Sequence, residues 1–187
     1  MRKIQKTTFE TAPEGNHPAR ITTVADLGVQ RSSYQGKERI GAKLGLTFEL
    51  ATEKTTDGKP FAVFDTVSLS LSEKSRLYEI AKAALGKTPE DLDPADLVGK
   101  PVMVSVIHRS GQDGKVWANV DRVTPIPKGF KVPATKTPFL TFDLESPDAE
   151  VFQKLPALFR KRIEERLKTG KAEFADPAFD PDADVPL

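Results

Sequence analysis

The stretch KLGLTFEL, residues 43–50, forms the clearest strand pattern in the sequence. Its apolar residues share one side and the remaining residues share the other: Leu44, Leu46, Phe48 and Leu50 against Lys43, Gly45, Thr47 and Glu49. A period of two is typical of a β-strand with one buried face. The pattern therefore predicts a strand whose apolar side faces a core and whose other side faces outward.

The segments on either side continue this pattern. Residues 21–29 alternate before a polar stretch at 31–39, which we interpret as a loop, and residues 61–71 alternate after residues 43–50. The intervening TTDGK, residues 55–59, contains Asp-Gly, a pair that supplies the positive φ angles of a tight hairpin turn. The sequence therefore predicts three consecutive strands.

The period changes after the third strand. Ser72 is a candidate N-cap, apolar residues then recur at helical spacing, and Gly86 is a stop signal. A connector at 88–98 follows, with a helical turn begun by Asp93-Pro94, and then two more alternating segments at 102–106 and 116–120. Three strands, a helix and two strands is the element order of the OB-fold, a five-stranded barrel. A generic α+β sandwich or another small barrel remains an alternative.

The flanking regions lack this alternation. Residues 1–18 predict a flexible arm before an OB-fold domain at 19–125, and the Pro- and Lys-rich residues 126–146 predict a linker or strap. Ser146-Pro147 opens a helix over 147–170, which Pro156 should kink or split because proline removes a helix hydrogen bond. Residues 171–187 cannot bury a core and predict a disordered acidic tail.

The composition excludes several classes of site. The 187 residues include no cysteine and only two histidines, far apart, so a disulfide framework or a zinc site is not expected. No apolar run approaches the roughly 20 residues of a membrane helix, and the basic N-terminus has no apolar segment behind it. We therefore expect a cytoplasmic protein that binds no membrane and no metal.

The net charge of +1 hides an asymmetry between body and tail. Residues 172–187 carry five acidic side chains and no basic one, which leaves 28 basic and 22 acidic side chains in residues 1–171, a net charge of +6. A basic body with an acidic tail is compatible with nucleic-acid binding.

Enzyme signatures are missing from the sequence. It has no phosphate-binding Walker loop, no Gly-x-Gly-x-x-Gly, no Gly-x-Ser-x-Gly and no His-Glu-x-x-His. Neighbouring acids such as Asp91 and Asp93 are interpreted as solvated surface. Asp65 falls on the apolar side of its strand, where a carboxylate needs a partner, so we expect it to make a structural hydrogen bond. No enzyme activity and no cofactor are expected.

Cations and aromatic side chains gather on the polar faces of the predicted strands and in the loops beside them. Proteins that hold single strands combine a positive groove with aromatic rings on which bases stack. In an OB-fold the binding face centres on the second and third strands. The predicted DNA-binding residues are Arg31, Tyr34, Lys37, Arg39, Lys43, Lys59, Phe64, Arg109, Lys115, Trp117 and Arg122.

The aromatic members of this set have competing interpretations. Phe64 and Trp117 could instead pack beneath the C-terminal helix, which needs an apolar surface to cover. Tyr34 lies in a basic stretch that contributes little to the core, which favours contact with DNA. The individual lysines are ordinary solvated residues, and only the cluster carries meaning.

The body and the tail resemble known protein families. PARI at 18–21, DLG at 26–28, YQG at 34–36, LGLTFEL at 44–50 and SLSEKSRL at 70–77 are similar to the OB-fold single-stranded-DNA-binding proteins of tailed bacteriophages. The last residues resemble the acidic tip of bacterial single-stranded-DNA-binding proteins, with Leu187 where that family has phenylalanine; they are Asp180, Asp182, Asp184, Val185, Pro186 and Leu187. A tip of this kind docks in basic pockets of replication and repair enzymes.

This resemblance implies sequence-independent coating of single-stranded DNA during phage replication or recombination, in the host cytoplasm. The tail would recruit replication or repair proteins, or compete with DNA for the basic groove. An OB-like structural or adaptor protein is the alternative, and a nuclease or recombination enzyme acting through Asp65 or Asp121 is a third. The sequence leaves the oligomeric state open, a homo-oligomer included.

Overall fold

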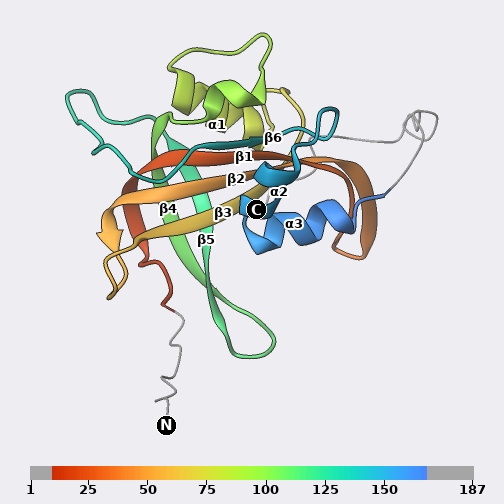
Figure 1. The fold of residues 1–187 in the computed structure, drawn as a ribbon, viewed down its shortest axis with the longest axis horizontal. Helices are drawn as coiled ribbons and strands as arrows, with labels where there is room; N and C mark the ends of the chain where they lie inside the picture. Colours follow the sequence, from red (N-terminus) through yellow and green to blue (C-terminus); the bar gives the residue numbers. More distant parts are fainter. Residues whose placement is uncertain (1–9, 168–187) are drawn as a thin grey trace.

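The computed structural model describes residues 10–167 of the chain. These residues form a mainly β structure with six strands, three α-helices and one 3-10 helix (Figure 1). In chain order the elements are β1 Gly15–Tyr34, β2 Lys37–Lys54, β3 Pro60–Ser68, α1 Arg76–Leu85, η1 Pro94–Leu97, β4 Pro101–Ser110, β5 Val116–Thr124, β6 Leu140–Phe142, α2 Ala149–Lys154 and α3 Ala157–Glu164.

One sheet holds all six strands, in the order β3-β2-β1-β4-β5. Neighbours along this path run antiparallel. The short β6 pairs in parallel with Thr23–Ala25 of β1, just beyond the point where the β1–β4 ladder ends at Arg20. The prediction of five strands was therefore wrong by one, because an edge left open by β4 is filled by residues expected to be a linker.

The two ends of this strand path are not joined by a hydrogen-bonded ladder among residues 10–167. Arg76, the first residue of α1, connects them instead. Its Nε donates to Asp65 Oδ2 of β3 at 2.6 Å, while Nη1 and Nη2 donate to the carbonyl oxygens of Asp121 and Val120 in β5, at 3.0 and 2.7 Å. The sheet is thus open in its hydrogen bonding, where the sequence predicted a barrel.

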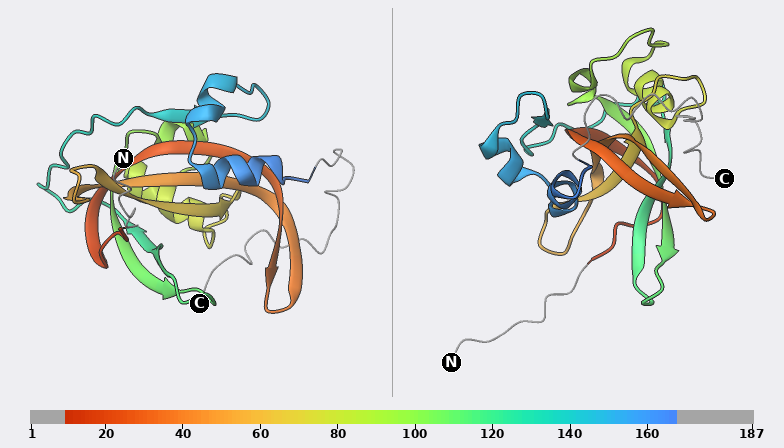
Figure 2. Two further views of the ribbon diagram at one scale, coloured as in Figure 1. Left: turned by 60° about the horizontal axis from the view of Figure 1, so that its bottom comes forward. Right: turned by 90° about the vertical axis from the view of Figure 1, so that its right-hand side faces the viewer.

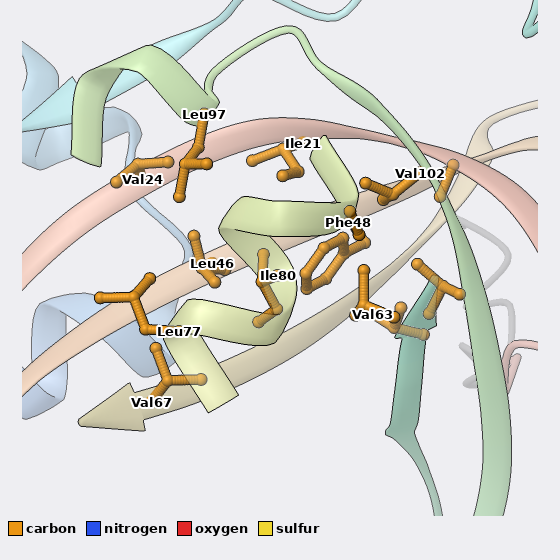
Figure 3. Packing of buried hydrophobic residues seen from close by; sticks show 14 of the residues in the cluster. Ile21, Val24, Leu46, Phe48, Val63, Val67, Leu77, Ile80, Leu97 and Val102 are labelled. Atoms are coloured by element: carbon orange, nitrogen blue, oxygen red, sulfur yellow. The ribbon is translucent and has the colours of Figure 1, made fainter. Parts of the chain in front are cut away.

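The main core lies on the concave side of the sheet, beneath α1 (Figure 3). Leu46, Phe48 and Leu50 of β2 are fully buried, as the alternation predicted, and Leu77 and Ile80 of α1 pack against them. The N-cap of α1 is Ser75, whose hydroxyl accepts from the N–H of Tyr78, and not Ser72. Residues 72–75 make a turn first, since the N–H of Ser75 donates to the carbonyl of Ser72.

A second core forms on the opposite face of β1 and β2. It consists of buried residues from β1, β6 and the C-terminal helices: Ala25, Leu27, Phe142, Leu155, Phe159 and Ile163. The single helix predicted at 147–170 is in fact two, because the chain leaves the helical conformation at Leu155 and Pro156, which confirms the predicted break. Figures 1 and 2 show α2 and α3 across the sheet from α1.

The strap between β5 and β6 is tied to the same outer face. Arg20 donates from Nη1 to the carbonyl of Gly99, and from Nη2 to those of Val132 and Pro133 at 3.2 and 3.3 Å. Glu49 accepts hydrogen bonds from the hydroxyls of Thr135 and Thr137 and is only 7% exposed. The outward side of β2 is therefore covered around Glu49, which its polar sequence did not predict.

Candidate nucleic-acid interface

Two hairpins, β1–β2 and β4–β5, extend beyond the body of the sheet, toward the right and toward the bottom of Figure 1. The sequence predicted a loop over 31–39, but β1 continues to Tyr34 and pairs there with Lys37. The turn has only two residues, Gln35 and Gly36, both with positive φ (49° and 74°), as a type I′ hairpin requires. The hydrophobic alternation of a half-buried strand is missing from residues 31–39, because both faces of the hairpin are polar there.

The register of the β1–β2 hairpin sorts its cations onto two faces. Lys37, Arg39 and Lys43 are separated by even steps along β2 and share the outer face. Arg31 lies on the other face, where its Nη1 contacts Glu38 Oε1 at 2.7 Å. Lys37 is exposed, Arg39 is half-buried, and the structure describes only the backbone of Tyr34. Three of the predicted cations therefore form one row.

Lys43 ends this row as a buried cation. It is 9% exposed, and its Nζ donates to Ser68 Oγ of β3 at 2.9 Å. Burial, and secondarily the charges of Arg39 and Arg162, lower the pKa of Lys43 to about 8. The predicted outward direction holds, but the C-terminal helices cover this part of the sheet. Lys43 can therefore act on a ligand only through its charge.

The β4–β5 hairpin carries the exposed aromatic ring. Trp117 is 48% exposed and pairs across the ladder with Arg109, which is also exposed. A bulge between Ser105 and Val106 shifts the register, so that exposed Arg122 returns to the face of Trp117. A ring and two guanidinium groups therefore lie along one face. Lys115 stands near the tip, with its Nζ 3.8 Å from Asp113.

The sequence left two interpretations of Phe64 open, packing beneath the C-terminal helix and contact with DNA, and its position is compatible with both. Its ring meets Phe159 of α3 edge-on, with centroids 5.8 Å apart and planes at 79°. The side chain nevertheless remains 39% exposed. Phe64 is thus a contact of the C-terminal helix with one edge open to solvent.

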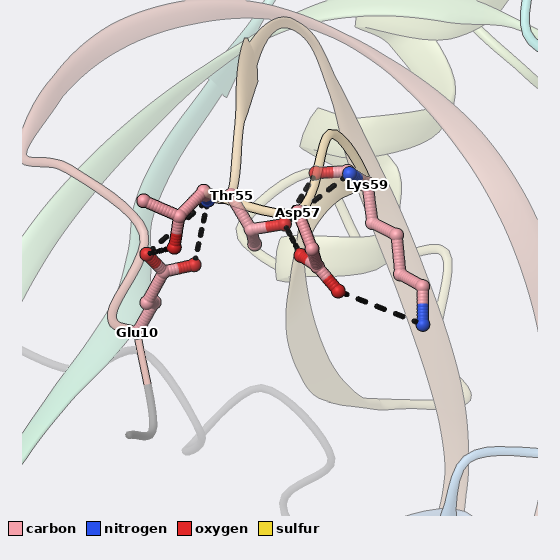
Figure 4. Close-up of polar contacts among 5 residues, drawn as sticks. Glu10, Thr55, Asp57 and Lys59 are labelled. Atoms are coloured by element: carbon pink, nitrogen blue, oxygen red, sulfur yellow. Dashed lines mark hydrogen bonds and ion pairs between the residues drawn. The ribbon is translucent and has the colours of Figure 1, made fainter. Parts of the chain in front are cut away.

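Lys59 lies apart from the other predicted residues, in the β2–β3 turn at the opposite end of β2 from the β1–β2 turn (Figure 1). Its Nζ lies 3.8 Å from Asp57 Oδ2, in a turn where Glu10 accepts from the N–H of Thr56 (Figure 4). The Thr55 hydroxyl donates to Asp57 and lowers the pKa of that carboxyl group. The structure does not bring Lys59 near the two hairpins.

Asp65 has the structural partner that the sequence predicted. Its carboxylate accepts from Arg76 Nε, and the Asp65 and Arg76 side chains are 15% and 14% exposed. Burial raises the pKa of Asp65, and the Arg76 guanidinium opposes that rise. Within residues 10–167 no group of three or more His, Asp or Glu side chains could hold a metal ion.

Sequence reasoning missed two cations, one in the last turn of α3 and one just after it. Arg162 and Arg166 reach the outer face of the β1–β2 hairpin, and only the path of the chain after β6 places them there. The predicted partner-binding residues of the tail, Asp180 to Leu187, lie outside the described residues.

Comparison with known proteins adds no relative. No protein-family model matches the chain, and no curated protein matches it. None of the helices within residues 10–167 is long and apolar enough to cross a membrane.

Proposed function

We propose that this chain is an OB-fold protein that binds single-stranded DNA without sequence preference. The strand order β3-β2-β1-β4-β5, with α1 between β3 and β4, supports the fold, because an OB-fold arranges its strands in this way once β3 meets β5. Arg76 holds β3 and β5 together at that junction.

The observation that carries the function is the exposed face of Trp117, Arg109 and Arg122. A large ring that is 48% exposed contributes little to the core, and it shares its face with two guanidinium groups that attract phosphates. Stacking of one base on an aromatic side chain contributes about 1–3 kcal/mol and tolerates every base. The β4–β5 hairpin, which carries this face, and the β1–β2 hairpin, which carries the cationic row, both extend beyond the body of the sheet (Figure 1).

The biological setting follows from the resemblance to phage proteins. The chain would coat single strands during phage DNA replication or recombination, and its acidic tail would recruit replication or repair proteins or compete with DNA for the cationic surfaces. Removing residues 172–187 should then tighten binding to DNA. Weaker or unchanged binding by the truncated chain would argue against competition.

The test is a titration of the full chain with oligo-dT of about 30 nucleotides, longer than the roughly 4–16 that one OB-fold covers. Trp117 fluorescence and the anisotropy of labelled DNA are recorded together, with duplex DNA as a control. Trp117→Ala should weaken binding by about tenfold, equivalent to roughly 1.4 kcal/mol of stacking. Phe130→Ala is the matched control, since Phe130 is equally exposed at 48% but lies in the strap.

Saturable quenching by the single strand that weakens with salt supports the proposal, since released counterions make such binding salt-dependent. If neither signal responds at low salt, single-strand binding is refuted. Quenching of Trp117 by a protein from the same phage or host would then favour the adaptor function.

A further inference from the structure

The turn of the β4–β5 hairpin lies against the indole of Trp117. Gly111 follows the last residue of β4 and comes two residues after Arg109, which is the register partner of Trp117. It therefore continues the face of the hairpin that carries the ring, diagonally across from it. A Cβ added to Gly111 would lie 3.3 Å from Trp117 Nε1. The nitrogen-bearing edge of the indole thus rests over Gly111, in space that any other side chain would fill.

The turn beneath this edge is fixed by its own hydrogen bonds. The N–H of Gly111 donates to the carbonyl of Lys115 at 2.8 Å, and the N–H of Gly114 donates to the carbonyl of Gly111 at 3.1 Å. Asp113 Oδ1 accepts from the N–H of Lys115, also at 3.1 Å. The surface on which the indole rests is therefore a hydrogen-bonded turn, which is formed in the absence of any ligand.

The backbone of Gly111 does not itself require glycine. Gly114 has a φ of 76°, in the left-handed region that favours glycine, whereas Gly111 is not among the described glycines with a positive φ. An added Cβ would instead meet Asp113 Oδ1 at 2.9 Å and Trp117 Nε1 at 3.3 Å, both closer than the 3.4–4 Å of ordinary van der Waals contact. The ring and the carboxylate, and not the φ angle, therefore disfavour other residues at this position.

We propose that Gly111 is a positioning residue, whose missing side chain lets the turn hold the Trp117 ring in the orientation that stacks on a DNA base. The ring rests on the turn by one edge while the residue stays 48% exposed, so a held edge and an open surface coexist. A side chain that is ordered before binding loses less conformational freedom when its ligand arrives. The inference rests on the proposed function for the stacking, but the contact between ring and turn does not.

The first test needs no DNA. Trp117 is the only tryptophan in the chain, so the decay of its fluorescence anisotropy reports the motion of this one ring. Gly111→Ala should increase the loss of anisotropy through local motion on the nanosecond timescale. Gln112→Ala is the matched control, because it changes the next, exposed residue of the same turn and should leave the decay as in the wild type. An unchanged decay in Gly111→Ala would overturn the positioning, whatever a DNA titration shows.

The second test is the titration of the same full-length variants with oligo-dT. Gly111→Ala should weaken binding by about two- to tenfold, the cost of ordering one side chain. The slope of log affinity against log salt should not change, because no charge is removed. Wild-type affinity in Gly111→Ala, where Trp117→Ala weakens binding, would overturn the proposal. If the wild type binds no oligo-dT, the proposed function is refuted, and the anisotropy decay still decides whether Gly111 holds the ring.

A third comparison separates the ring from the carboxylate. Asp113→Ala removes the atom nearest to the added Cβ, so Gly111→Ala in that background would press only on Trp117. The double variant should show a looser ring and weaker binding than Asp113→Ala alone. Identical anisotropy decays in the double variant and Asp113→Ala would assign the effect of Gly111→Ala to the carboxylate, and would overturn the role of Gly111 in holding the ring.

Discussion

The outer faces of β2 and β5 differ in how far other parts of the chain cover them. On β2 the outward residues are polar or small, yet Glu49 and Thr47 are buried beneath the strap and the C-terminal helices, at 7% and 6% exposed. On β5 the outward face carries Trp117, which is 48% exposed. A polar face is covered and an aromatic face is left open, which reverses the usual relation between hydrophobicity and burial. Stability explains the first arrangement, and the proposed binding of DNA accounts for the second.

Replacing the ring that covers β2 gives the largest expected effect. Phe159 is fully buried between α3 and Gly45, and Phe159→Ala should lower the free energy of unfolding by about 3–5 kcal/mol. Trp117→Ala should cost less than about 1 kcal/mol, as expected of an exposed residue. Urea unfolding followed by circular dichroism measures both. Equal losses would erase the distinction between the covered face and the open one.

Arg76 joins the two regions, because it bonds to β3 beside the covered strand and to β5 of the open hairpin. Arg76→Met should cost about 3 kcal/mol, since it leaves Asp65 buried without its partner. Adding Asp65→Leu should recover much of that loss, because the unpaired carboxylate is then gone. A single variant as stable as the wild type would show that β3 and β5 do not depend on this contact.

The sequence predicted what depends on local rules. The inward side of residues 43–50, the stop at Gly86, the break at Pro156 and the need of Asp65 for a hydrogen bond were all predicted, because alternation, capping, proline geometry and charge burial act locally. That Arg76 makes this bond was not predicted. The covering of β2 depends instead on where residues 126–167 lie. No local pattern in β2 predicts this covering, apart from the absence of a side chain at Gly45.

Two further errors share this origin. The segment 31–39 looked like a loop because a hairpin with two polar faces lacks the hydrophobic alternation that marks a half-buried strand. β6 is only three residues long and forms because β4 leaves the edge of β1 open. The sequence therefore predicted which residues form the candidate site. It could not predict that they divide between the exposed face of the β4–β5 hairpin and the cationic row on β2, because that division depends on the fold.

Gly45 tests the covering of β2 at a single atom, the Cβ that glycine lacks. A Cβ at this position would lie 2.9–3.0 Å from the ring of Phe159, so Gly45→Ala should cost about 1–3 kcal/mol through overpacking. The penalty should shrink in the Phe159→Leu background, where the ring is absent. A double-mutant cycle by urea unfolding measures this coupling. Additive effects would mean that α3 is not pressed against β2.

Replacing Lys43 gives the smallest expected change in the free energy of unfolding, and it tests how much the burial of a cation costs. Its pKa is about 8 in the folded chain and 10.5 ordinarily, so between these pH values the unfolded chain binds more protons at this residue. The free energy of unfolding contributed by Lys43 should therefore rise with pH through this window, while below about pH 8 the penalty of the buried charge is fully present.

Lys43→Met removes both the penalty and its titration. The variant should be more stable than the wild type at pH 7 by on the order of 1–2 kcal/mol, and this difference should shrink as the pH approaches 10. Urea unfolding of both chains at matched pH values measures it, and the exposed Lys82→Met serves as the control with the same change of charge. A difference independent of pH would mean that Lys43 keeps its ordinary pKa and that the outer face of β2 is open to water, like that of β5.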